Sequence, residues 1–231
     1  MKIIKNEKHI KRNGQIGNWL SLGALVVLGI GMYISVERTD LFVYALFALL
    51  AGFTMTQIGM YLGNKYSRSP RPDEKLDAGL KGLQNEFAIY HYSTPASHLL
   101  AGPAGLWLLF PYHQRGQVTY KKNRWQMSGG GFMQGYMRIF GQEGVGRPDI
   151  EIESEMRQLR KMLAKHMDET EVPEINAMLV FTSDEVEIEA GDSPFPAMKV
   201  KQIKDFFRQK MKEKPIGQTQ LAAVKAALPE E

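Results

Sequence analysis

Residues 97–118, SHLLAGPAGLWLLFPYHQRGQV, predict two strands that fold back on each other around a Gly-Pro turn. Residues 98–102 are short and apolar, and residues 105–112 form an almost continuous apolar run bounded by Gly and Pro. Such a run is typical of a strand that is buried on both faces of a sheet. The stretch therefore predicts a hairpin that belongs inside a folded core.

The segment before this hairpin predicts a helix over residues 73–87. Its apolar side chains recur at helical spacing, and they are Leu76, Leu80, Leu83 and Phe87. Asp73 is available as the N-terminal cap of this helix. We expect Glu74, Asp77 and Glu86 to form a solvated face, because charged side chains on a helix usually point to water.

The other segments predict further elements of the same domain. Strands are expected in residues 87–93, 116–128, 175–183 and 185–200, a Gly-rich loop in 129–149, and helices in 149–167, 200–213 and 219–231. The resulting order is α-β-β-β-loop-α-β-β-α. This order predicts an α/β or α+β domain with a central mixed sheet that is flanked by helices.

Two segments near the N-terminus predict a transmembrane hairpin. Residues 13–36 and 41–64 contain no charged side chain, and about 20 apolar residues suffice to cross a bilayer core of about 30 Å. A signal peptide is an alternative for the first segment, but the apolar run is too long and a second one follows at once. A buried hairpin of a soluble protein is the other alternative, although neither segment has a polar face.

The charges beside these segments predict their orientation. Five Lys or Arg precede the first segment, and Lys65, Arg68 and Arg71 follow the second, whereas the connection has one Arg and two acids. The positive-inside rule then places both termini in the cytoplasm of a multi-pass protein of the plasma membrane. We expect a basic N-terminus (1–12), the hairpin (13–64), a linker (65–75), a cytoplasmic domain (76–212) and a tail (213–231).

The net charge of +4 comes from the membrane flanks. Residues 1–72 carry nine Lys or Arg against three acids, and residues 73–231 carry 20 against 22. The positive excess therefore suits anionic lipid headgroups, and the charge balance of the domain argues against nucleic acid as a partner. The chain has no cysteine, which excludes disulfides, thiolate catalysis and zinc-thiolate sites.

Three motifs together resemble the NERD (nuclease-related) domain family. They are HLLAGPAGLWLLFPYHQRGQVTYKKNRW at 98–125, LRKMLAKHM at 159–167 and INAMLVFTS at 175–183. GPAG at 102–105 matches the turn of that family, and Arg115, Gly116 and Trp125 fit the following turn and arm. The resemblance covers most of residues 73–208, and it implies a restriction-endonuclease-like fold with the α-β-β-β-α-β core of PD-(D/E)xK nucleases.

The same resemblance implies that the catalytic positions are altered. Ser97 stands where the family has a metal-binding Asp, and Phe110 and Tyr112 stand where it has Glu-x-Lys. Magnesium requires oxygen ligands in tight geometry, and it activates the attacking water in such nucleases. We therefore expect a pseudoenzyme with no catalytic residue, no metal site and no cofactor. If the chain were active, it would be a magnesium-dependent phosphodiesterase.

Several other residues are candidates for a site. His98, His113, Glu86 and Arg115 could line a pocket. Carboxylates displaced in sequence could replace the missing ligands, and these are Glu86, Glu143 and Asp149. The histidines at positions 91, 98 and 113 could bind a metal ion or could simply form local hydrogen bonds.

One basic and aromatic group lies in the expected hairpin of residues 116–128. Lys121, Lys122 and Arg124 stand beside Tyr120 and Trp125. This group could contact nucleic acid or lipid headgroups. A solvated hairpin tip is the simpler interpretation.

These observations leave three hypotheses on function. The first is a non-catalytic binding or scaffolding module that is anchored to the lipid bilayer. The second is a membrane-tethered, metal-dependent nuclease. The third is an accessory subunit of a membrane complex, or a homo-oligomer, whose hairpin packs against partner helices. Small residues that would allow such packing are Gly23, Gly29, Gly31, Gly52 and Gly59.

Overall fold

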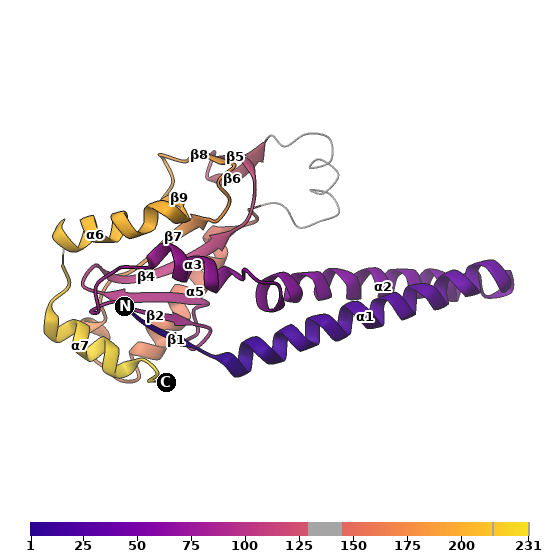
Figure 1. Ribbon diagram of the computed structural model, residues 1–231, viewed down its shortest axis with the longest axis horizontal. Helices are drawn as coiled ribbons and strands as arrows, with labels where there is room; N and C mark the ends of the chain where they lie inside the picture. The colour runs from indigo at the N-terminus through magenta and orange to yellow at the C-terminus, as the bar shows by residue number, and fades with distance from the viewer. Residues whose placement is uncertain (129–144, 214, 231) are drawn as a thin grey trace. The chain divides into compact units, whose positions relative to one another are not determined.

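The computed structural model describes residues 1–128, 145–213 and 215–230, and the chain forms two compact units (Figure 1). One unit is Glu7–Arg71, and the other combines Met1–Asn6 with Pro72–Glu231. The second unit is a mixed α/β domain. Most of the predicted Gly-rich loop, residues 129–144, lies outside the described residues.

The first unit is a pair of apolar helices, as the sequence predicts. Helix α1 (Glu7–Glu37) and helix α2 (Phe42–Leu62) are joined by one short turn, η1 (Thr39–Leu41), and both are long and apolar enough to cross a membrane. Their large apolar side chains point outward, with Trp19 72 % and Leu25 68 % exposed. Helix α1 begins before the uncharged segment, so Lys8, Lys11 and Arg12 lie on its first turns.

Glycines allow the two helices of this unit to approach closely. Gly52 and Gly59 are buried on α2. A Cβ atom on Gly52 would lie 2.6 Å from Leu28 Cγ, and one on Gly59 would collide with Ser21. Gly31 also lies in this interface, whereas nothing lies within 4 Å of a Cβ on Gly29. Small residues therefore serve close packing of α1 against α2 within the hairpin.

The domain is built on a mixed sheet of six strands (Figure 1). The strand order is β1-β2-β3-β4-β7-β9, with bounds Lys2–Lys5, Ala88–His91, His98–Gly102, Gly105–Tyr112, Ile175–Phe181 and Ala197–Lys199. Neighbours pair in parallel except for β2 with β3 and β3 with β4, which are antiparallel. The mixed α/β class and the central mixed sheet agree with the prediction from the sequence.

The predicted hairpin of residues 98–112 forms the middle of this sheet. Strands β3 and β4 have the predicted bounds, and Leu99 pairs with Leu108. The turn at residues 102–105 uses Gly105 at a φ of +97°, a conformation that favours glycine. Strand β4 lies between β3 and β7, so its side chains are buried on both faces.

Helices cover both faces of the sheet. Leu106, Leu108 and Phe110 pack in the cluster that contains Ile152 and Leu159 of α5 (Pro148–Leu163). Trp107 and Leu109 point the other way, because side chains alternate along a strand. They pack in a second cluster, whose helical members are Leu76 and Leu80 of α3 (Pro72–Leu80) and Ile203 and Phe207 of α6 (Ile203–Glu213).

A second, three-stranded sheet has the order β6-β5-β8, with bounds Arg124–Ser128, Gly116–Lys121 and Val186–Glu189. Lys122 and Asn123 form the two-residue turn between β5 and β6, with φ values of 53° and 56°. Positive φ at both positions is typical of a type I′ hairpin turn. The C-terminal segment contains helix α7 (Gln218–Ala227), which the sequence also predicts.

The N-terminus differs from the prediction. The sequence predicts that residues 1–12 form a basic flank of the membrane hairpin, whereas Lys2–Lys5 form strand β1, in register with Ala88–His91 of β2. The partner of β1 is remote in sequence, so no local pattern reveals it. The apolar hairpin is therefore inserted between the first strand of the domain and the rest of that domain.

The helix predicted over residues 73–87 is shorter than expected. Helix α3 ends at Leu80, and Gly82 has a φ of +89°. Leu83 and Phe87 are still buried, because they pack from the connection into the cluster beneath α3 and α6. Asp73 is not at the N-cap position, because α3 begins at Pro72, and its carboxylate accepts a hydrogen bond from Lys5 Nζ.

Candidate functional site

The three positions that the family resemblance marks as catalytic surround the start of β3 and the end of β4. Ser97 directly precedes β3, and both its backbone N–H and its hydroxyl donate to Glu155 of α5, at 3.1 and 2.8 Å. Phe110 is only 5 % exposed and fills the core. Tyr112 stacks on Phe181, with the ring centroids 5.7 Å apart. Two of the three positions thus serve packing.

Tyr112 is held as a neutral phenol. Burial raises its pKa, and the carboxylates of Glu151, Glu155 and Asp149 raise the pKa further. The hydroxyl is buried, with no hydrogen-bond partner among the described residues. Tyr112 therefore cannot supply the positive charge that a catalytic lysine would bring to this position.

Glu155 is a site residue that the sequence interpretation misses. It lies on the partly buried side of α5, between the buried positions Ile152 and Leu159. An acidic side chain at helical spacing from apolar residues on both sides was the available signal.

The acids considered as replacements do not join Glu155 at Ser97. Asp149 pairs with Arg147 at 2.8 Å, and Glu86 is exposed. Glu143 lies outside the described residues. In the part of the chain that the structure describes, no three His, Asp or Glu side chains group as metal ligands.

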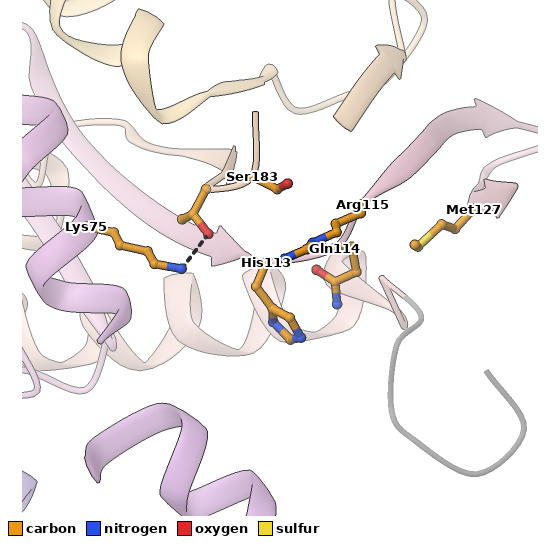
Figure 2. Close-up of a pocket in the computed structure, with 7 residues that line it drawn as sticks. Lys75, His113, Gln114, Arg115, Met127 and Ser183 are labelled. Atoms are coloured by element: carbon orange, nitrogen blue, oxygen red, sulfur yellow. Dashed lines mark hydrogen bonds between the residues drawn. The ribbon is translucent and has the colours of Figure 1, made fainter. Parts of the chain in front are cut away.

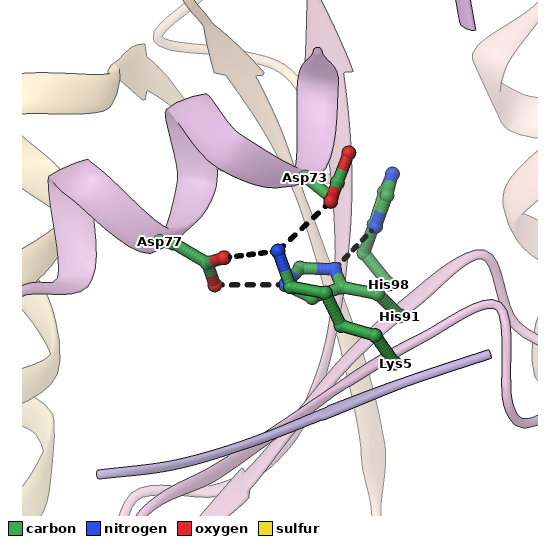
Figure 3. Close-up of polar contacts among 5 residues, drawn as sticks. All are labelled: Lys5, Asp73, Asp77, His91 and His98. Carbon is green, nitrogen blue, oxygen red and sulfur yellow. Dashed lines mark hydrogen bonds and ion pairs between the residues drawn. The ribbon is translucent and has the colours of Figure 1, made fainter. Parts of the chain in front are cut away.

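A polar cluster lies on the face of the sheet that α3 covers, opposite the face on which Ser97 contacts α5. We call Lys5, Asp73, Asp77, His91 and His98 the Lys5 cluster (Figure 3). Strand register explains it, because Lys5 pairs with His91 and His91 pairs with His98 across three adjacent strands. Asp73 and Asp77 are four residues apart on α3, so they share one face of the helix. Asp77 is therefore not on a solvated face.

The Lys5 ammonium joins the two carboxylates of α3. Lys5 Nζ lies 2.9 Å from Asp73 Oδ2 and 2.6 Å from Asp77 Oδ2, and Asp73 is fully buried. Burial of Lys5 lowers its pKa, but hydrogen bonds to Asp77 and Asp73 outweigh burial, and the pKa is raised overall. The ion pair connects the residues just before the pair of apolar helices to those just after it.

The two histidines form a hydrogen bond with each other. His91 Nδ1 lies 2.8 Å from His98 Nδ1, and His91 Nε2 lies 2.9 Å from Asp77 Oδ1. Since a carboxylate accepts, His91 Nε2 carries a proton and donates to Asp77. One of the two Nδ1 atoms then donates to the other. While this bond exists, one Nδ1 atom carries a hydrogen and the other does not. His113 is not part of the cluster.

A pocket opens where β4 and β7 end (Figure 2). Its volume is about 480 Å³. The lining residues are Lys75, His113, Gln114, Arg115, Met127, Thr182 and Ser183. Of the four residues that the sequence grouped as a pocket, His113 and Arg115 lie here. His98 is buried in the Lys5 cluster, and Glu86 lies elsewhere on the surface.

The basic hairpin tip is exposed. Lys121, Lys122 and Arg124 lie at the turn between β5 and β6, and all three side chains point to solvent. The rings of Tyr120 and Trp125 pack together behind them, with centroids 5.3 Å apart. This arrangement fits a solvated tip. Contacts of the tip with lipid headgroups or nucleic acid stay predictions.

Comparison of the chain with models of protein families, with curated proteins and with solved structures finds no match.

Proposed function

We propose that this protein is a membrane-anchored, non-catalytic binding or scaffolding module with a degenerate nuclease-like domain. The observation that carries the proposal is that the side chains at the three expected catalytic positions make structural contacts. Ser97 is bound by Glu155, Phe110 fills the core, and Tyr112 is buried against Phe181. Side chains with these contacts cannot hold a divalent ion.

The connectivity of the domain supports a restriction-endonuclease-like fold. Helix α3 is followed by β2, β3 and β4, which pair in antiparallel fashion, and then by α5 and β7. Strand β7 lies parallel to β4. This is the α-β-β-β-α-β order that the resemblance to the NERD family implies, with the added strands β5 and β6 between β4 and α5.

The insertion of the helices supports a membrane anchor with one orientation. Strand β1 precedes α1 and α3 follows α2, and both belong to the same domain. If the helices span a bilayer, the N-terminal strand and the rest of the domain must lie on the same side. The excess of Lys and Arg at the domain end of both helices favours the cytoplasm of the plasma membrane.

The chemistry of magnesium argues against the nuclease alternative. Magnesium takes octahedral oxygen ligation, with carboxylates as its usual anchors. Beside Ser97 the described residues supply one hydrogen-bonded carboxylate, that of Glu155, and the Glu-x-Lys positions supply a phenyl ring and a neutral phenol. Neither ring can stabilise the charge that develops on a phosphoryl group.

A nuclease assay on the purified full-length chain tests the proposal. In a neutral detergent with magnesium or manganese, we expect DNA and RNA to be cleaved no faster than with EDTA. Glu155→Gln and its matched control Glu153→Gln, an exposed acid on the same helix, should behave alike. Metal-dependent cleavage that Glu155→Gln abolishes and Glu153→Gln retains would overturn the proposal.

A further inference from the structure

We propose that the pocket at the ends of β4 and β7 binds a phosphate-bearing ligand. This inference rests on the proposed function, in that it names the class of ligand that the binding module would take. Parallel strands β4 and β7 end side by side, and ligands commonly bind where adjacent parallel strands end. Residues 113–115 therefore face residues 182–183 across one opening.

The cations of the pocket are available to a ligand. Lys75 is half-buried on α3 and contacts Thr182 Oγ1 at 3.4 Å (Figure 2). Within the described part of the chain, Lys75 forms no ion pair. Arg115 contacts Glu185 at 3.5 Å, but both side chains are about two-thirds exposed, at 65 % and 68 %. Exposed surface pairs of this kind are weak, so a ligand can replace Glu185 at small cost.

Neutral donors complete the pocket. Thr182 and Ser183 bring hydroxyl groups, and Gln114 brings a carboxamide that is 6 % exposed. The backbone N–H of Thr182 donates to the Tyr112 carbonyl at 2.7 Å, which fixes Thr182 beside the end of β4. The hydroxyls of Thr182 and Ser183 can donate to an anion without adding negative charge.

Charge and size favour a phosphate over a metal ion or a carboxylate. Among the described residues that line the pocket, Lys75 and Arg115 are cations and none is acidic. A phosphate monoester carries about −1.5 to −2 charges and three acceptor oxygens, which suits several convergent donors. The volume of about 480 Å³ falls in the usual range of small-molecule sites, about 300–1,000 Å³. It can hold a phosphate with a small organic group attached.

The phosphate could belong to a soluble metabolite or to a lipid headgroup, and one experiment separates these sources. In the first arm, the full-length chain in a neutral detergent is titrated calorimetrically with inorganic phosphate and with glycerol 3-phosphate at constant ionic strength. In the second arm, the melting temperature is measured in phosphatidylcholine nanodiscs with and without phosphatidylglycerol.

Two variants and a control test whether the ligand binds in this pocket. Lys75→Met removes the half-buried cation, and Lys81→Met, an exposed lysine just after α3, is the matched control. Loss of one charge-assisted contact should weaken binding about tenfold in Lys75→Met. The control should bind like the unchanged chain. Thr182→Val is a second variant in the event that Lys75→Met fails to fold.

Saturable binding of glycerol 3-phosphate that Lys75→Met weakens would assign a soluble phosphate. A melting shift with phosphatidylglycerol that only Lys75→Met reduces would assign a lipid headgroup. If neither arm distinguishes Lys75→Met or Thr182→Val from Lys81→Met, or if binding requires an oligonucleotide, the proposal is wrong. These outcomes are independent of the nuclease assay, so the two proposals can fail separately.

Discussion

Replacing Lys5 with methionine is expected to lower the free energy of unfolding by about 3 kcal/mol, the lower end of the range for breaking a buried ion pair. The methionine keeps the length of the side chain but removes the ammonium that contacts Asp73 and Asp77. Asp73 is fully buried, so its carboxylate cannot recover this contact from bulk water. The melting temperature should fall by about 6–12 °C for a chain of this size.

Lys2→Met is the matched control for this prediction. Lys2 lies on the same strand and has the same charge, but its side chain is exposed. Thermal unfolding of the full-length chain in one detergent compares the two variants. Equal melting temperatures for Lys5→Met and Lys2→Met would mean that the Lys5 cluster does not stabilise the domain.

The effect of Lys5→Met should depend on pH in one direction. The pKa of the Lys5 ammonium is raised in the folded chain from its usual value of 10.5, by the carboxylates of Asp77 and Asp73 acting against burial. A group with a raised pKa stabilises the fold below its unfolded pKa, and this stabilisation is lost as the pH rises through the folded pKa. The difference in unfolding free energy between the unchanged chain and Lys5→Met should therefore be constant from neutral pH to about pH 9. It should shrink above about pH 10.5.

Replacing residues 7–71 by a short Gly-Ser linker is expected to move the protein from the membrane fraction to the soluble fraction. The helices α1 and α2 expose large apolar side chains along their length, and exposed apolar surface of this extent requires a bilayer or a partner. The contact between Lys5 and Asp73 keeps the two ends of the insertion close. Full-length chain should sediment with membranes after a carbonate wash, and the linker variant should stay in the supernatant.

The fragment that begins at Pro72 is the control for the linker variant. It also lacks the helices, but it loses β1, which pairs with β2. It also loses the partner of Asp73 and Asp77. We expect this fragment to melt at a lower temperature than the linker variant or to aggregate. A linker variant that remains with the membranes would show that the helices are not the anchor.

The elements that could be predicted from the sequence are those whose signal is local. Strands β3 and β4 were recognisable because residues 98–112 are apolar around a turn, and α1 and α2 because they lack charge. Strand β1 is four residues long, and its partner β2 begins at Ala88. Its sequence, KIIK, resembles the basic flank of a membrane helix, so only the folded sheet identifies it as a strand.

The same reasoning applies to the candidate sites. His113 and Arg115 were among the residues predicted to line a pocket, whereas Lys75, Thr182 and Ser183 come to the pocket from α3 and the end of β7. The role of Asp77 depends on the register of three strands. Contacts of this kind depend on pairing between distant segments, and one-dimensional patterns do not contain them.

The most direct test of the membrane account uses the absence of cysteine from the chain. A single cysteine is introduced either at Thr39, in the exposed connection between α1 and α2, or at Asp192, in an exposed turn of the domain. Intact cells that express each variant are treated with a membrane-impermeant maleimide. We expect Thr39→Cys to be labelled from outside and Asp192→Cys to be labelled only after lysis. Labelling of Asp192→Cys in intact cells, or of Thr39→Cys only after lysis, would contradict a hairpin that spans the bilayer and holds its domain in the cytoplasm.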